Sequence, residues 1–246
     1  MSGHSKWANT KHRKGKQDIK RAKIFTKLAR AITVATREGG AEPEYNAALA
    51  TAIEKAKADN MPNDNIDRAI KTGLGGLNGE TFDHITYEAY GPCGTAFMVQ
   101  CLTNNKNRTA ADVRHYFSKY GGNLGTTGCV GYLFDRKGII TIDLSDNIDE
   151  ENLMMQALDF GAEDMETNDV YEITTQPEDF LSVLNKLKEA GYEAKGEVAF
   201  LPQNYINVEG EGDLKNLDKL IDALDDNDDV QEVFHNWDMP EEDDEE

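Results

Sequence analysis

The chain has 246 residues, of which 39% are hydrophobic, and a net charge of −20 at pH 7. This length and composition suit one to three domains with buried cores. No stretch approaches the ~18 consecutive apolar residues of a membrane-spanning helix, and the first residues lack the apolar segment of a secretory signal. The three cysteines form no C-x-x-C pair, which indicates reduced thiols, so we expect a cytoplasmic protein with no membrane partner.

The charge is divided very unevenly along the chain. Residues 1–37 contain eleven Lys/Arg and one acid, a net of +10. The other 209 residues hold 15 Lys/Arg and 45 Asp/Glu, a net of −30. An acidic body repels phosphate over about a Debye length, so a polyanion should be met through the N-terminal part.

The first sixteen residues form a cationic arm. They include five Lys or Arg, two His and one Trp, but no acid, and their few apolar residues have no helical or strand spacing. Cations neutralise phosphates and an exposed indole stacks on a base, so this pattern favours nucleic acid. The alternatives are a solvated tail, or a Trp7 that packs the arm onto the helical domain. The candidate residues of the arm are Lys6, Trp7, Lys11, His12, Arg13, Lys14 and Lys16.

Three helices are expected after the arm. Residues 17–37 have an apolar stripe and cationic outer faces, on which Lys20 and Arg21 are further candidates for binding nucleic acid. A second helix is predicted over 44–59 and a short third one from an N-cap at Asn63 to about Gly73. The glycine-rich segment 73–79 looks like a hinge. We therefore predict a basic helical domain over residues 1–78.

Strands and helices alternate beyond the hinge. Strands are predicted at 85–90, 95–103, 130–134, 138–143, 163–167, 170–175, 192–200, 205–208 and 230–236. Helices are predicted at 108–120, 149–160, 177–190 and 213–224. Residues 138–200 alone follow the ferredoxin-like order strand–helix–strand–strand–helix–strand, and the elements on either side repeat that order.

We therefore predict an α+β fold: a helical N-terminal domain followed by two ferredoxin-like α/β sandwiches, one inserted in the other. The host domain would comprise residues 79–136 plus 202–246, and the inserted domain residues 137–201. An alternative is that Asp135-Arg-Lys-Gly138 is an ordinary hairpin turn within one larger sheet.

A second basic patch opens the helix predicted at 108–120. Lys106, Arg108 and the helix N-terminus together could hold a phosphate, and Arg114 and His115 follow on the same helix. The structural alternative is a polar helix cap with solvated cations, and the sequence leaves both open.

No catalytic motif stands out. The sequence lacks G-x-S-x-G, H-E-x-x-H, the Walker A motif and metal-ligand spacing among its five histidines. The glycine-rich segment 121–128 follows a helix, which favours a C-cap and turn over a phosphate cradle. We expect no enzymatic activity, no cofactor, no metal and no small-molecule substrate.

Five segments, which together span all but the acidic tail, stand out: Gly3–Lys14, Tyr87–Thr95, Asn107–His115, Phe117–Gly125 and Asp229–Asn236. They resemble the YebC family of transcriptional regulatory proteins, which also includes mitochondrial translational activators. Thr10 stands where the family commonly has Ile, and Cys93 where it commonly has Gly. The resemblance implies three domains, a helical N-terminal domain and no enzymatic activity.

The resemblance leaves two functions open. The first is a DNA-binding regulator of transcription that acts through the basic arm and helical domain. The alternative is a ribosome-associated translation factor that binds ribosomal RNA and relieves stalls at proline runs. The acidic body could also contact a protein partner, such as a basic ribosomal protein.

Overall fold

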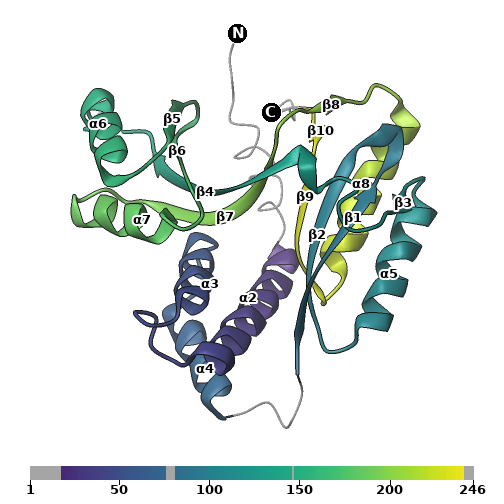
Figure 1. The fold of residues 1–246 in the computed structure, drawn as a ribbon, viewed down its shortest axis with the longest axis horizontal. Coiled ribbons are helices and arrows are strands. Elements are labelled where there is room, and N and C mark those ends of the chain that lie inside the picture. The colour runs from purple at the N-terminus through teal and green to yellow at the C-terminus, as the bar shows by residue number, and fades with distance from the viewer. Residues whose placement is uncertain (1–17, 76–80, 146, 241–246) are drawn as a thin grey trace. The chain divides into compact units, whose positions relative to one another are not determined.

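A computed structural model describes residues 18–75, 81–145 and 147–240 (Figure 1). The chain divides into two compact units: residues 1–76 with 136–199, and residues 77–135 with 200–246. We describe each unit by itself. The three-domain division predicted above, with its bounds, stays a prediction. Within the described ranges, no helix is long and apolar enough to cross a membrane.

The first unit begins with three helices: α2 (Asp18–Gly39), α3 (Ala47–Ala58) and α4 (Asn63–Gly75). Their apolar faces share one core, which contains Leu28, Ile32, Leu49, Ile53 and Ile66. The three predicted helices are confirmed, but α3 begins three residues later than expected. Asn63 is the first residue of α4 rather than its N-cap, because the N–H groups of Asn65 and Ile66 bond to the carbonyl of Pro62.

Two residues, Asn46 and Gly73, fix how these helices are joined. The Asn46 side chain donates to the carbonyls of Ala35 and Gly40, each at 2.8 Å, and accepts the N–H of Leu49 at 3.0 Å. One buried amide thus satisfies the end of α2 and the start of α3. Gly73 lies inside α4, where a Cβ would stand 2.7 Å from the Thr33 carbonyl. Its lack of a side chain allows α4 to approach α2. The rest of the predicted hinge, residues 76–79, lies outside the described part.

The first unit also contains a sandwich of four strands and two helices. Its elements are β4 (Phe134–Asp143), α6 (Glu150–Phe160), β5 (Asp164–Thr167), β6 (Val170–Thr175), α7 (Phe180–Glu189) and β7 (Lys195–Pro202). The sheet order is β5-β6-β4-β7, which confirms the ferredoxin-like arrangement. Both helices pack on one face of the sheet, through residues such as Ile140, Leu153, Ile173, Val183 and Leu187.

The second unit contains another four-stranded antiparallel sheet, covered by two helices. Its elements are β1 (Asp83–Tyr90), β2 (Ala96–Thr103), α5 (Lys106–Lys119), β3 (Asn123–Leu124), α8 (Glu211–Asp226) and β9 (Val230–His235). The sheet order is β3-β1-β2-β9. Helices α5 and α8 pack on one face around Phe97, Val113, Phe117, Leu220 and Val233.

The strands of this second sheet differ from the predicted set. We expected 130–134 and 205–208 to be sheet strands, but β1 and β3 take those places. β1 pairs with β2 along its whole length, from Asp83↔Thr103 to Tyr90↔Ala96, through a tight turn. Such a local hairpin forms more readily than a pairing with a distant two-residue strand. The segment β8 (Ile206–Asn207) instead pairs with β10 (Trp237–Asp238).

The prediction for residues 130–138 was also wrong. Gly131–Leu133 is a short 3-10 helix, and β4 then runs unbroken through Asp135–Gly138, so this segment is not a hairpin turn. Gly138 serves close packing rather than a turn, because a Cβ there would lie 2.7 Å from the Cβ of Phe180. Just before β4, the Leu133 carbonyl accepts the N–H of Gln203, which follows β7, at 2.9 Å.

The turn between β1 and β2 contains Cys93 in the left-handed region, at φ 57° and ψ 19°. A residue with a Cβ is uncommon in this conformation, and glycine adopts it without a steric penalty. The Cys93 thiol donates to an Asp213 carboxylate oxygen at 3.3 Å. A glycine at this position would adopt the same geometry without strain.

The glycine-rich segment after α5 wraps around a carboxylate. Gly121 has φ 86° and the Gly122 N–H bonds to Phe117, which agrees with the expected helix C-cap. The buried Glu88 carboxylate then accepts the N–H groups of Gly128, Val130 and Gly131 at 2.7, 2.9 and 2.7 Å. Burial by itself raises the pKa of Glu88, but these three donors outweigh it and lower the pKa. The backbone N–H groups that could have bound a phosphate are thus already bonded to the Glu88 carboxylate.

We predict that Glu88→Gln destabilises the protein by about 1–3 kcal/mol at pH 7, because an amide NH2 would replace one acceptor oxygen. The measurement is urea unfolding across a pH series. Since the folded pKa is below the ordinary value of 4.5, the carboxylate contributes fully above that pH and loses its contribution as the pH falls through the folded pKa. The difference between the two proteins should therefore shrink in acid.

The matched control is Glu193→Gln, at an exposed position. This change should alter the free energy of unfolding by less than about 0.5 kcal/mol. Equal unfolding free energies for Glu88→Gln and the unchanged protein at pH 7 would contradict the assigned role of Glu88.

Candidate nucleic-acid interface

The cationic arm predicted from the sequence lies outside the described residues. This applies to Lys6, Trp7, Lys11, His12, Arg13, Lys14 and Lys16. Lys20 and Arg21 belong to the first turn of α2, but the description does not extend to their side chains. The described part of the predicted interface is therefore the rest of α2, together with α5.

Helix α2 separates apolar and cationic side chains onto different faces. Leu28, Ile32 and Ala35 are buried against α3 and α4. Lys23 and Arg37 are exposed, and Lys27 and Arg30 are half-buried. Core packing thus fixes the rotation of α2 and determines which way its cations face, as expected for an amphipathic surface helix.

The N-terminus of α5 has internal partners for the groups that could hold a phosphate. The Asn105 side chain caps the helix by accepting the N–H of Arg108 at 3.1 Å. The Lys106 ammonium pairs with Asp83 at 3.0 Å. The Arg108 guanidinium pairs with Asp229 at 2.6 Å and also donates to Asn104. These contacts fit the alternative that the sequence left open, in which the patch is a polar helix cap rather than a phosphate site.

The carboxylate of Asp229 is the centre of a buried hydrogen-bond network. One of its oxygens accepts from the hydroxyls of Thr103, at 3.1 Å, and Thr109, at 2.8 Å, as well as from Arg108. Burial by itself raises the pKa of Asp229, but the bond and charge from Arg108, with both hydroxyls, outweigh it and lower the pKa. The network joins the end of β2, the start of α5 and the start of β9.

Arg114 and His115 have a different position on α5. Both are exposed, and the His115 ring lies edge-on to Tyr116 with 6.1 Å between ring centroids. Lys119, one turn further on, lies over the ring of Tyr120. The structure therefore places Arg114 and His115 at the surface of α5, whereas Arg108 is bonded to a buried carboxylate.

The described residues provide no evident site for a metal. Among them, no three or more His, Cys, Asp or Glu side chains are grouped so that they could hold an ion. Helix α2 and the outer surface of α5 instead offer cations on rigid helices, an arrangement that can contact the phosphates of a nucleic acid.

Comparison with known sequences identifies the family. Residues 5–76 match the family model described as TACO1/YebC protein N-terminal domain. Residues 82–237 match the one described as TACO1/YebC second and third domain. The chain belongs to the TACO1/YebC family. This confirms the resemblance read from the sequence segments.

Other TACO1/YebC relatives match nearly the whole chain. A probable transcriptional regulatory protein of Finegoldia magna is 55% identical over 240 residues, which are 97% of this chain and 99% of the relative. A probable transcriptional regulatory protein of Clostridioides difficile is 59% identical over 233 residues, or 94% and 98% of the two chains. The crystal structure of a conserved hypothetical protein from Aquifex aeolicus is 45% identical and superposes with a TM-score of 0.78, covering 93% of this chain and 95% of its own.

For this TACO1/YebC chain, sequence reasoning missed the partner of Arg108. Asp229 lies in a run of acids at the end of α8 and before β9, and nothing in the sequence of the run distinguishes it from its neighbours. Only the sheet order, which places β9 beside β2, brings Asp229 to the start of α5. Thr103 and Thr109 offered no signal either, because isolated threonines are common at strand and helix ends.

We predict that Arg108→Gln lowers the free energy of unfolding by about 1–2 kcal/mol, because the buried carboxylate of Asp229 loses its charged donor. This value is discounted for the exposure of the guanidinium. Arg114→Gln, on the outer surface of the same helix, is the matched control and should change stability by less than about 0.5 kcal/mol. Urea unfolding at pH 7 provides the measurement.

A double-mutant cycle with Asp229→Asn isolates the pair. The two single changes should be non-additive by about 1 kcal/mol, since each removes the same interaction. Full additivity, or an Arg108→Gln protein as stable as the unchanged one, would show that the ion pair contributes nothing to stability.

Proposed function

We propose that this chain is a cytoplasmic regulator of gene expression that binds nucleic acid, with DNA as its target. Binding would occur through the arm of residues 1–16 and the start of α2, and no catalysis or cofactor is needed. The observation that carries the proposal is the segregation of charge, +10 over residues 1–37 against −30 over the rest. The names of the relatives, probable transcriptional regulatory proteins, support a regulatory role.

The physical argument rests on counterion release. Each phosphate that a Lys or Arg neutralises frees condensed ions, so cations gathered in one segment bind a polyanion far better than the same cations dispersed. The acidic remainder of the chain would repel the same polyanion. This combination directs a nucleic acid to one end of the sequence.

Helix α2 would serve as a rigid continuation of the arm. Its buried stripe holds it against α3 and α4, so its cations keep fixed positions relative to one another. Arg114 and His115 on α5 would be a second contact, and Arg108 would take part only while sharing its guanidinium with Asp229. We propose the three-part division of the chain, with a basic helical domain over residues 1–78, as the framework for this function.

We predict a steep salt dependence of binding to duplex DNA. The change of log affinity with log salt should be about −0.9 for each neutralised phosphate. Replacing Lys11, Arg13 and Lys14 together by Gln should reduce the slope by about three units, if each contacts one phosphate. Gel-shift titrations between low and moderate salt give the slope.

The matched control replaces three exposed cations outside the basic helical domain, Lys186, Lys195 and Lys215, by Gln and should leave the slope unchanged. An affinity that barely moves with salt would exclude this mechanism. Uniform affinity for all duplexes, together with sedimentation of the protein in ribosomal fractions of a sucrose gradient, would instead assign the arm to ribosomal RNA.

We predict that Trp7→Ala weakens nucleic-acid binding by about 1–3 kcal/mol through lost base stacking, with little change in salt slope. Trp7→Phe keeps an aromatic face and should restore much of the affinity. Neither change should alter the melting temperature, since a polar arm contributes little core. Gel-shift titrations give the affinities of the variants. In the protein that keeps Trp7, fluorescence titration reads the indole directly in a Trp237→Phe background, which removes the buried second tryptophan, 1% exposed.

The competing account makes Trp7 a packing residue. In that case the indole would already be blue-shifted and resistant to quenchers before nucleic acid is added, and Trp7→Ala would lower the melting temperature. Either observation would refute the stacking role.

A further inference from the structure

The outer face of α6 exposes three large apolar side chains. Met154, Met155 and Leu158 are 37%, 56% and 47% exposed, whereas Leu153 and Ala157 on the opposite side are fully buried in the sandwich core. At 100° per residue, the three exposed side chains fall within one arc of the helix. The sandwich core therefore does not need this apolar arc.

Methionine gives this face a particular character. Its unbranched, polarisable side chain adapts to differently shaped partners, and exposed methionines are over-used at adaptable binding surfaces. A contiguous exposed apolar patch of this kind marks an interaction site more often than a scattered single residue does. Two adjacent methionines and a leucine one turn away form such a patch.

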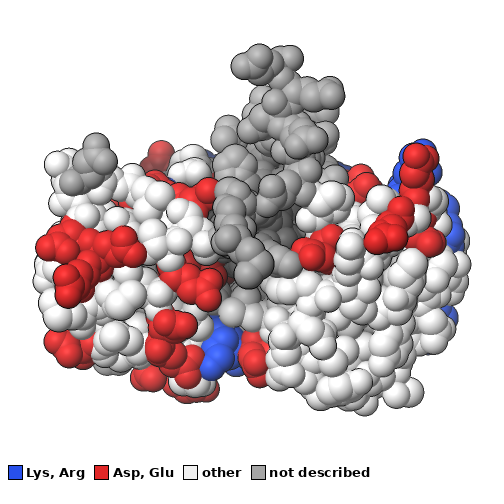
Figure 2. All heavy atoms as spheres, turned by 90° about the horizontal axis from the view of Figure 1, so that it is seen from above, with Lys and Arg blue, Asp and Glu red and all other residues white. Residues whose placement is uncertain are grey.

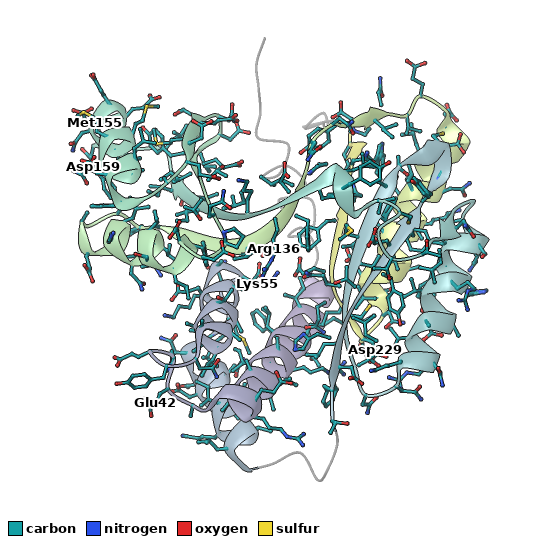
Figure 3. The ribbon with its side chains drawn as sticks, in the orientation of Figure 1. Glu42, Lys55, Arg136, Met155, Asp159 and Asp229 are labelled. Carbon is teal, nitrogen blue, oxygen red and sulfur yellow. The ribbon has the colours of Figure 1, made fainter. Side chains whose placement is uncertain are left out.

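The surroundings of the patch are strongly acidic. The 48 residues from 138 to 185 contain thirteen Asp or Glu and no Lys, Arg or His. Asp149, Glu150, Glu151 and Asp159 lie on or beside α6 and are exposed. Figure 3 shows Met155 and Asp159 on the outer side of the helix, and the space-filling view has Asp and Glu gathered around this region (Figure 2).

The cation next to this helix is directed elsewhere. Lys186, on α7, donates to the carbonyl of Phe160 at 3.2 Å, at the C-terminal end of α6. Its ammonium also lies 5.8 Å from the Phe160 ring centroid. Phe160 packs against the sandwich core, so this contact belongs to the inner side of α6 rather than to the exposed arc.

We propose that the outer face of α6 is a docking surface for a cationic amphipathic helix of a protein partner. The partner's apolar stripe packs against Met154, Met155 and Leu158, with contacts spaced three and four residues apart. Its flanking Lys and Arg side chains meet the acidic surroundings of α6, which give electrostatic complementarity and speed association. The same acidity excludes a nucleic acid from this face, so the docking surface is not a nucleic-acid site.

The test uses the full chain and a synthetic amphipathic peptide of leucines and lysines as the probe. Fluorescence anisotropy measures its binding, and a peptide of the same composition in scrambled order is the control probe. Replacing Met154, Met155 and Leu158 by Ser should weaken binding of the ordered peptide at least tenfold. Replacing both methionines by Leu keeps the apolar face and should leave the affinity within threefold.

A second set of substitutions controls for surface apolarity in general. Leu74, Leu144 and Tyr132 are exposed outside α6, and replacing them by Ser should leave peptide affinity within twofold. Two outcomes would overturn the proposal: peptide binding that the three serine substitutions on α6 do not weaken, and equal binding of the ordered and scrambled peptides. Either would show that only general charge attraction holds the peptide.

The methionines also allow a direct spectroscopic readout. The chain has seven, of which Met61, Met98 and Met165 are buried and Met154 and Met155 lie on the patch. With methyl-labelled methionine, the peptide should shift the signals of Met154 and Met155 and leave the buried ones in place. Unchanged buried signals in the serine variant also confirm that it is folded, and a peptide that shifts only other methionines would overturn the proposal.

Two further outcomes would assign the surface to a different occupant. Self-association in sedimentation experiments that the α6 serines abolish would make it an interface between copies of this chain. A tenfold gain in peptide affinity on deleting residues 1–16 would make the chain's own cationic arm the occupant. Either result overturns the assignment to a protein partner.

Discussion

A chain this acidic must find donors for every carboxylate that it buries, and this requirement governs how its elements are joined. Glu88 is held by three backbone N–H groups, Asp229 by a guanidinium and two hydroxyls, and Glu197 on β7 by the ammonium of Lys55 on α3 at 2.8 Å. Each case ties together segments that are distant in sequence. An unpaired buried charge costs several kcal/mol, so these donors keep the acids compatible with the fold.

Some of the cations outside the N-terminal segment provide this internal neutralisation. Arg108, Lys106 and Lys55 are each committed to a carboxylate in the described structure. The largest excess of cations over acids lies in residues 1–37, which precede the acidic part of the chain. In our proposal the basic segment binds a ligand, while cations elsewhere neutralise acids inside the fold.

Sequence reasoning predicted the elements with strong local signals. The periodicity of residues 17–37 and the strand–helix order of 138–200 were enough for the helical part and for the inserted sandwich. The host sheet was predicted incompletely. The sequence of β8 is typical of a strand, and we expected it beside β2, but β8 pairs with β10 and β1 lies beside β2 instead. At the candidate site, the cations could be predicted from composition. The bond between Arg108 and Asp229 could not, because the two residues are 121 positions apart and no local sequence pattern links them.

The hydrogen bond between Gln203 and Leu133 has a consequence for how the host sandwich tolerates its insert. This bond joins the residue before β4 to the residue after β7, which are the points where the chain enters and leaves the inserted sandwich. For the host sandwich, the insert therefore acts as a loop whose two ends are held together. The entropy lost on closing a loop grows only with the logarithm of its length, about 0.6 kcal/mol for each doubling. The host therefore carries a complete second sandwich for little more conformational cost than a long surface loop, and the inserted sandwich can vary in sequence without straining the sheet that holds it.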